Sequence, residues 1–143
     1  MGNVFGAVGS TLANPSRITV AATPSGLELV AIAGGKLWHT VRKSDGHWTA
    51  WGDVFGAVHG TLTDPTRVTV APTASGLEVL TVASGKLWHA VRKPDATWTP
   101  WGDVFGAAGT LTGLSEATAT PAGTDLKVLA GATGLIGYTK RAN

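Results

Sequence analysis

The chain has 143 residues, of which 14% are charged, with a net charge of +2 and no cysteine. These values predict a single domain without disulfide bonds or thiolate chemistry, and the scattered Lys and Arg residues argue against a nucleic-acid partner. The 20 glycines, and an apolar share made mainly of Val, Leu, Ala and Trp, are typical of an all-β protein. We expect no membrane span and no signal peptide. The location is left open between the cytoplasm and release without a classical signal.

The sequence repeats itself with a period of about 50 residues. Gly2–Trp51 and Gly52–Trp101 align without a gap and share about 31 identical residues in about 50 positions. A third copy begins at Gly102 and carries a one-residue deletion. It stops before a counterpart of Thr97–Trp101. The sequence therefore predicts one segment, residues 1–143, with repeats at about 2–51 and 52–101 and an incomplete repeat at 102–143.

Each full repeat predicts four short strands separated by turn residues. In the first repeat these are Arg17–Val20, which is rich in β-branched residues, then Leu27–Ala33, Lys36–Arg42 and His47–Trp51. The glycine pair before Lys36 predicts a tight hairpin loop. Four antiparallel strands in about 40 to 50 residues are typical of a β-propeller blade. The second repeat predicts the same strands at Arg67–Val70, Leu77–Ala83, Lys86–Arg92 and Thr97–Trp101.

The second and third strands of a repeat predict a sheet that is buried on both sides. Alternate residues of a hairpin share a face, and here both faces are largely apolar. A propeller blade lies between two neighbours and buries both faces, whereas a β-sandwich, the alternative fold, would alternate apolar and polar residues. One predicted face carries Glu28, Val30, Ile32, Leu37, His39 and Val41, and the other carries Leu27, Leu29, Ala31, Trp38, Thr40 and Arg42.

The segment contains two complete repeats and one incomplete repeat, which are too few blades to close a ring alone. Propellers typically use about four to eight blades, and an open array exposes a blade face and a sheet edge. Either the segment belongs to a longer chain or several copies close the ring. We favour β-propeller blades of four antiparallel strands, closed by oligomerisation, with a homo-oligomeric dimer ahead of a trimer. The segment Gly2–Phe5 matches the residues after each closing Trp and is a candidate for the missing edge of the third blade.

The six Trp residues recur at identical offsets in the two full repeats and point to repeated binding pockets. A Trp ring stacks on the C–H side of a sugar, while His and Arg hydrogen-bond its hydroxyls. Packing between blades is the alternative role for each Trp, and an ion pair between blades is the alternative for each Arg. The third repeat has Gly137–Tyr138 and Lys127 where the others have Trp-His and Glu, which predicts a weaker site or none. The predicted sugar-binding residues are His39, Arg42, Trp48 and Trp51, then His89, Arg92, Trp98 and Trp101.

Signals for enzymatic catalysis are poor. Catalysis needs one asymmetric cluster of acid, base and nucleophile, whereas the ionisable residues here recur once per repeat. The turn at Ser44–Trp48 is similar to the Asp-box of sialidase propellers, but we interpret it as turn chemistry. The four His residues lack the spacing of metal ligands. We therefore expect neither an enzyme nor a metal or other cofactor.

The pattern Gly-Lys-Leu-Trp-His-x-Val-Arg-Lys, followed by x-Trp-Thr-x-Trp-Gly-Asp-Val, resembles the repeat of the Photorhabdus-type bacterial β-propeller lectins. The likeness covers both full repeats and part of the third. It implies a seven-bladed ring with monosaccharide pockets between adjacent blades, for fucose or galactose-type sugars. This chain is far shorter. We predict a multivalent, non-enzymatic carbohydrate-binding lectin with glycan partners, the alternative being a self-assembling propeller scaffold, engineered or a fragment, without a small ligand.

Overall fold

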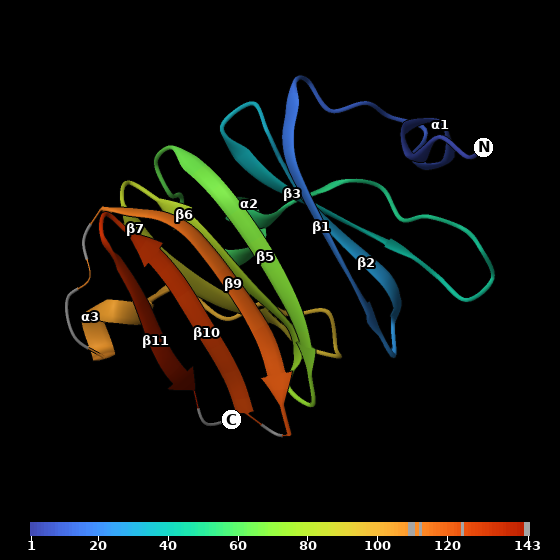
Figure 1. Cartoon of the computed structure of the whole chain (residues 1–143). Coiled ribbons are helices and arrows are strands. Elements are labelled where there is room, and N and C mark those ends of the chain that lie inside the picture. The colour runs from blue at the N-terminus through green and yellow to red at the C-terminus, as the bar shows by residue number, and fades with distance from the viewer. Residues whose placement is uncertain (109–110, 112, 124, 142–143) are drawn as a thin grey trace.

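The computed structural model describes residues 1–108, 111, 113–123 and 125–141. The chain is an all-β protein of three antiparallel sheets, one from each repeat (Figure 1). We call them the first, second and third sheets, and their strands follow one another in sequence order. The first sheet contains β1 (Pro15–Thr23), β2 (Gly26–Ala33), β3 (Lys36–Arg42) and β4 (Gly52–Asp53). The second contains β5 (Pro65–Thr73), β6 (Gly76–Ala83), β7 (Lys86–Arg92) and β8 (Gly102–Asp103), and the third contains β9 (Leu114–Ala122), β10 (Asp125–Ala132) and β11 (Leu135–Arg141).

The first three strands of each full repeat are confirmed, but the position of the fourth is wrong. Instead of a strand over the predicted residues 47–51, the structure has a single bridge between Trp48 and Arg42. The Thr49 amide still donates a 2.9 Å hydrogen bond to the Val41 carbonyl, but the Val41 amide donates to the Thr49 hydroxyl, at 3.0 Å, instead of to a backbone carbonyl. The strand itself, β4, comes just after and pairs Asp53 with Trp38 of β3. The second repeat has the same arrangement at Trp98, Thr99 and Asp103.

Three short helices, which the sequence analysis did not predict, open the repeats: α1 (Val4–Val8), α2 (Val54–Val58) and α3 (Val104–Ala108). The carboxylate of Asp53 accepts hydrogen bonds from the amides of the first turn of α2, at Phe55 and Gly56, and so caps this helix. The Asn3 side chain caps α1 in the same way by accepting from the Phe5 amide. Asp53 therefore ends the first sheet and starts the second repeat.

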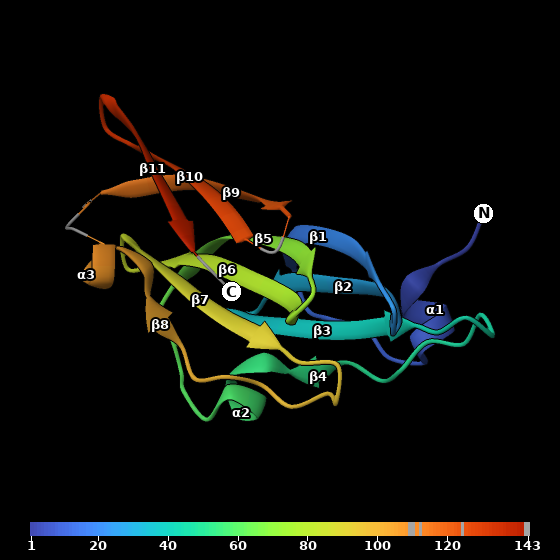
Figure 2. The ribbon, with the colours of Figure 1, turned by 90° about the horizontal axis from the view of Figure 1, so that it is seen from below.

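The sheets pack face to face, and their first strands are neighbours, with β5 between β1 and β9 (Figures 1 and 2). The core between the first two sheets includes Ile32 and Leu37 from one side and Val79 from the other. The core between the second and third includes Leu87 and Val128. The second sheet is thus buried on both faces, as predicted, and three sheets replace the two of the β-sandwich alternative. The predicted face assignment of the first repeat is confirmed by the register of β2 and β3.

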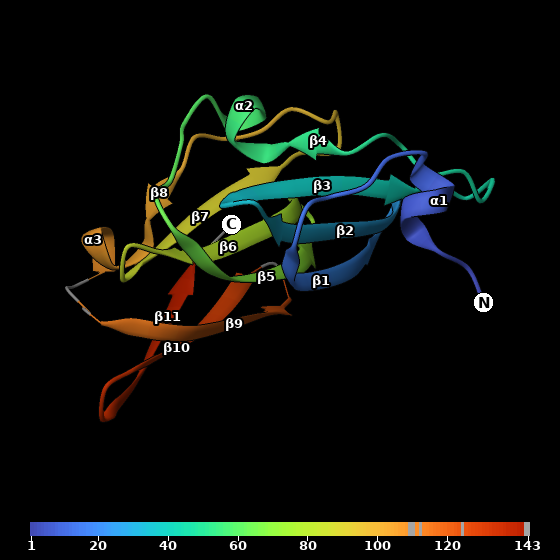
Figure 3. The same cartoon turned by 90° about the horizontal axis from the view of Figure 1, so that it is seen from above.

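The first and third sheets each leave apolar side chains exposed on the side away from the second sheet. Helices α1 and α3 lie at opposite ends of the molecule (Figure 3). In the described part of the chain, no helix is long and apolar enough to cross a membrane. On the side away from the second sheet, the exposed large apolar residues are Ile18, Val20 and Leu27 in the first sheet and Leu129, Ile136 and Tyr138 in the third. Leu135, which pairs with Ala132 and shares its face, and Met1 are exposed as well.

Candidate functional site

A cluster of polar side chains is buried between the first and second sheets. The carboxylate of Glu28 on β2 lies 2.7 Å from His39 Nε2 on β3 and accepts a 2.7 Å hydrogen bond from the Thr23 hydroxyl. Arg92 reaches it from β7 of the second sheet, with Nη1 3.3 Å from Glu28 Oε2. The ring of Trp98 meets the His39 ring edge to face, with 5.7 Å between the centroids. Three of the predicted site residues, His39, Arg92 and Trp98, therefore meet here, and they come from two repeats.

Glu28 is ionised and its charge is matched. The residue is only 1% exposed, and this burial, the largest single influence, acts to raise the pKa of its carboxyl group. The hydrogen bonds from His39 and Thr23, together with the nearby charge of Arg92, outweigh burial and hold the pKa of Glu28 below its ordinary value. The Arg92 side chain is 13% exposed, so its guanidinium is engaged by protein rather than by water. Arg92 thus forms an ion pair with Glu28 of the preceding repeat, which is the alternative role given for the Arg residues in the sequence analysis.

The second boundary, between the second and third sheets, repeats part of this cluster. Glu78 is buried, accepts a 2.8 Å hydrogen bond from the Thr73 hydroxyl, and contacts His89 Nε2. Arg141 of β11 occupies the place of Arg92 by sequence, but its side chain lies outside the described residues. In the third sheet itself, Lys127 takes the place of Glu28.

Arg42 and Trp48 line an open cavity of about 180 Å³ at the outer side of the first sheet. The other walls come from the N-terminal segment at residues 2–4 and from Ala7 of α1. Arg42 is exposed, and no ion pair to its guanidinium is found in the described part of the chain. The Trp48 ring and the Arg42 guanidinium, which has no ion-pair partner among the described residues, therefore line the same small cavity.

Trp51 and Trp101 pack against the short helices. The Trp101 ring lies edge-on to Phe55 of α2, 6.4 Å between centroids, and its indole N–H donates a 3.0 Å hydrogen bond to the Gly60 carbonyl. Trp51 packs on Phe5 of α1 with the two rings tilted by 57° and 6.3 Å between their centroids. Its indole nitrogen is buried and has no hydrogen-bond partner among the described residues. Trp101 packs against the core between the first two sheets, whereas Trp48 and Trp51 pack against the core of the first sheet and each also lines a cavity.

The sequence analysis grouped the eight site residues by repeat, and the structure groups them by sheet boundary. His39 meets Arg92 and Trp98 of the following repeat, while Arg42 and Trp48 share a cavity with the N-terminal segment. The face pattern already placed Glu28 and His39 on one side of the sheet. It left open which neighbouring sheet that side meets. Thr23, which also holds the Glu28 carboxylate, was missed, because a threonine at the end of a strand carries no sequence signal for this role.

No cluster of three or more His, Asp or Glu side chains that could hold a metal ion is found among the described residues. Comparisons with protein-family models, curated proteins and solved structures found no match to this chain.

Proposed function

We propose that this chain is a multivalent carbohydrate-binding lectin built from β-propeller blades, and that it binds monosaccharides of the fucose or galactose type without turning them over. The observation that carries the proposal is the open cavity at Arg42 and Trp48. It combines an aromatic side chain with an arginine that no described carboxylate neutralises.

The chemistry of this cavity suits a sugar. The Trp48 indole offers an apolar surface to the C–H side of a pyranose, and the Arg42 guanidinium donates several hydrogen bonds to hydroxyl oxygens. The side-chain amide of Asn3, at the cavity wall, has both donor and acceptor groups. At about 180 Å³ the cavity lies below the range of about 300 to 1,000 Å³ that drug-sized ligands fill. A single sugar ring is therefore the appropriate ligand.

Multivalency would follow from oligomerisation, because each copy contributes its own Arg42–Trp48 cavity. Single shallow sites bind weakly, and several sites on one body gain affinity for a surface that displays many sugars. Closure of the blades into a ring by oligomerisation, as a dimer ahead of a trimer, belongs to this proposal. It would place one Arg–Trp cavity of each copy beside a neighbouring sheet.

The self-assembling scaffold remains the second candidate, and one observation favours it. At the boundary between the first and second sheets, the residues corresponding to Arg42 and Trp48 are Arg92 and Trp98, and these are engaged with Glu28 and His39. The same residue types that would bind sugar at one boundary hold sheets together at the next. A scaffold would use them in this way at every boundary.

Glycan-array screening followed by calorimetric titration with fucose and galactose separates the two candidates. A lectin shows saturable binding that Trp48→Ala and Arg42→Ala each weaken by about tenfold or more, since each removes one of the few contacts to a small ligand. Lys43→Ala, at an exposed neighbouring position outside the cavity, is the matched control and should bind as the unmodified chain does. No saturable binding to any glycan would reject the lectin in favour of the scaffold.

A further inference from the structure

The third sheet lacks the edge pairing that the other two sheets have. In the first sheet, Gly52–Asp53 pairs with β3 at His39 and Trp38, and in the second, Gly102–Asp103 pairs with β7 in the same register. Among the described strands, β11 has only β10 as a neighbour. The corresponding segment of the first repeat, Gly2–Asn3, is exposed and belongs to no strand. An unpaired strand edge and an unpaired copy of its usual partner thus lie in the same chain.

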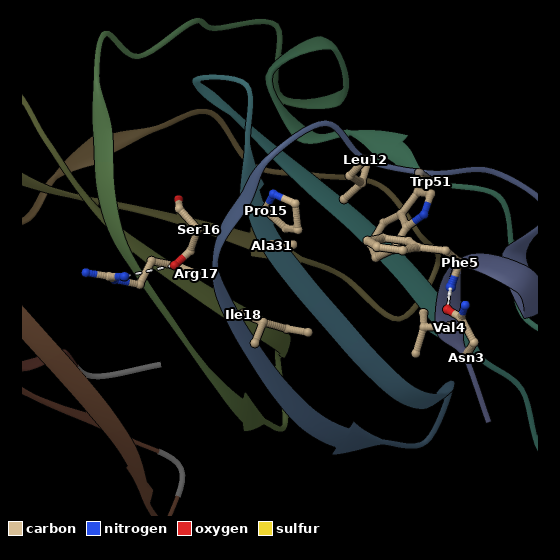
Figure 4. A pocket seen from close by; sticks show the side chains of 10 residues that line it. All are labelled: Asn3, Val4, Phe5, Leu12, Pro15, Ser16, Arg17, Ile18, Ala31 and Trp51. Carbon is tan, nitrogen blue, oxygen red and sulfur yellow. Dashed lines mark hydrogen bonds between the residues drawn. The ribbon is translucent and has the colours of Figure 1, made fainter. Parts of the chain in front are cut away.

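The outer face of the first sheet holds a cavity of about 570 Å³ with mostly apolar walls (Figure 4). Phe5, Leu12, Ile18 and Trp51 line it. Their counterparts in the second repeat, Phe55, Leu62, Val68 and Trp101, pack in the core between the first two sheets together with Ile32 and Leu37 of the first sheet. The cavity is therefore the place where a further sheet would insert its apolar side chains.

The outer face of the third sheet carries an apolar side chain, Ile136, of the kind that fills the corresponding position at the internal boundary. Ile136 of β11 corresponds to Leu37 of β3, which is fully buried at the internal boundary. Ile136 is 75% exposed. Leu129 of β10, which corresponds to Val30, is exposed on the same face. Each end of the molecule therefore presents one half of the interface that is complete inside it.

We propose that the third sheet of one molecule docks head to tail on the first sheet of a second copy. In this arrangement Gly2–Asn3 of the second copy pairs with β11 at Tyr138 and Gly137, and Ile136 enters the cavity beside Trp51. The strand pairing and the apolar packing repeat those between sheets of a single chain. The inference deepens the proposed function by naming the interface of its oligomer. The docked boundary includes Asn3 and Arg42, which also line the proposed sugar cavity, whereas the test of assembly by mass needs no sugar.

Two charged pairs distinguish this docking from other modes of association. Across the internal boundary of the second and third sheets, Arg67 Nε lies 2.6 Å from the Glu116 carboxylate. Head-to-tail docking brings Arg17 of the second copy, at the position equivalent to Arg67, next to the same Glu116. It also brings Arg42 of the second copy next to Lys127, where the internal boundary has Arg92 next to Glu28. One pair attracts and the other repels, so the docked interface is weaker than the internal one.

Light scattering of the intact chain over a range of concentrations tests the proposal. The unmodified chain should form a discrete oligomer. Ile136→Lys should dissociate it, because the new charge would be buried in an apolar cavity. Leu135→Lys is the matched control: Leu135 is also exposed, at 55%, but it corresponds to Lys36, which stays exposed beside Asp53, so the oligomer should persist. Equal behaviour of the two variants, or a monomer at all concentrations, would overturn the proposal.

A variant that strengthens association guards against effects of misfolding. Lys127→Glu restores the glutamate of the internal boundary and should tighten the oligomer by about tenfold or more, since it replaces a repulsion with an attraction. Lys43→Glu makes the same charge change at an exposed site and should not. If Lys127→Glu is no tighter than Lys43→Glu, the register proposed here is wrong.

Discussion

The three sheets are formed by three copies of one repeat, but the third copy differs from the first two in its strands and in its buried polar residues. The first two have four strands each and a buried Glu–His pair. In the described part of the chain the third has three strands, and Lys127 and Tyr138 replace the Glu and the His. On its other face, Leu126, Val128 and Ala130 remain buried against the second sheet. Divergence in the third repeat is thus largest on the face that has no neighbour within the chain. Burial, more than sequence position, explains which residues stayed similar.

The largest expected difference between these regions is in the loss of stability when a glycine is replaced at the turn before β6 or before β10. Gly76 has a φ of 125°, and a Cβ there would lie 2.1 Å from the Arg92 carbonyl oxygen. Gly76→Ala should lower the free energy of unfolding by at least about 4 kcal/mol, because it combines backbone strain with a backbone clash. At Gly123 of the third sheet a Cβ would meet nothing within 4 Å. Gly123→Ala should cost only about 1 kcal/mol, from its positive φ. Urea unfolding of both variants measures the difference.

The next largest difference concerns the buried carboxylate. Glu28→Gln leaves the Arg92 cation without its counter-charge and should lower the free energy of unfolding by about 3 kcal/mol. Lys127→Gln, at the corresponding position of the third sheet, is exposed and should change it by less than about 0.5 kcal/mol. Denaturant melts of the two variants compare the positions directly. Combining Glu28→Gln with Arg92→Met should recover much of the loss, because the unpaired charge is then removed. If the double variant is as unstable as Glu28→Gln, the pair is not coupled.

A pH titration sharpens the same contrast. The pKa of Glu28 is lower in the folded protein than its ordinary value of 4.5, so the folded state favours the ionised carboxylate. Its contribution to stability is fully present above the ordinary pKa and is lost as the pH falls through the lowered, folded-state pKa. The difference in unfolding free energy between the unmodified chain and Glu28→Gln should therefore shrink between pH 6 and pH 3. A difference that stays constant over this range would contradict the ionised pair.

The smallest expected effect is at the ion pair between the second and third sheets. The side chain of Glu116 is 62% exposed, and exposed pairs contribute little. Glu116→Gln should lower the free energy of unfolding by less than about 1 kcal/mol, and added salt should reduce the loss further. Thermal melts at low and high salt measure it. A loss as large as that of Glu28→Gln would show that the third sheet depends on electrostatics more than its apolar core indicates.

The long strands and the two faces of each sheet could be predicted from the sequence, because alternation and turn residues are local signals. The fourth strand could not be placed, because Trp48 and Trp98 look like strand residues but make a single bridge each. The short helices have too few residues for a periodic pattern, although an Asp or Asn before Val-Phe-Gly-Ala is a capping signal in hindsight. At the site, the meeting of His39 with Arg92 depends on which sheets are neighbours, and that is not a local property.

The double role of Asp53 has a consequence for folding cooperativity. This residue pairs with β3 of the first sheet, binds Lys36 across 2.8 Å, and caps α2 of the following repeat. The 50-residue unit that recurs in the sequence therefore differs from the unit that is held together in space, since each repeat completes the preceding sheet before it starts its own. Unfolding of one unit removes an edge and a helix cap shared with its neighbour. Stability thus propagates along the array as a nearest-neighbour coupling, and a truncation at any repeat boundary disrupts two sheets at once.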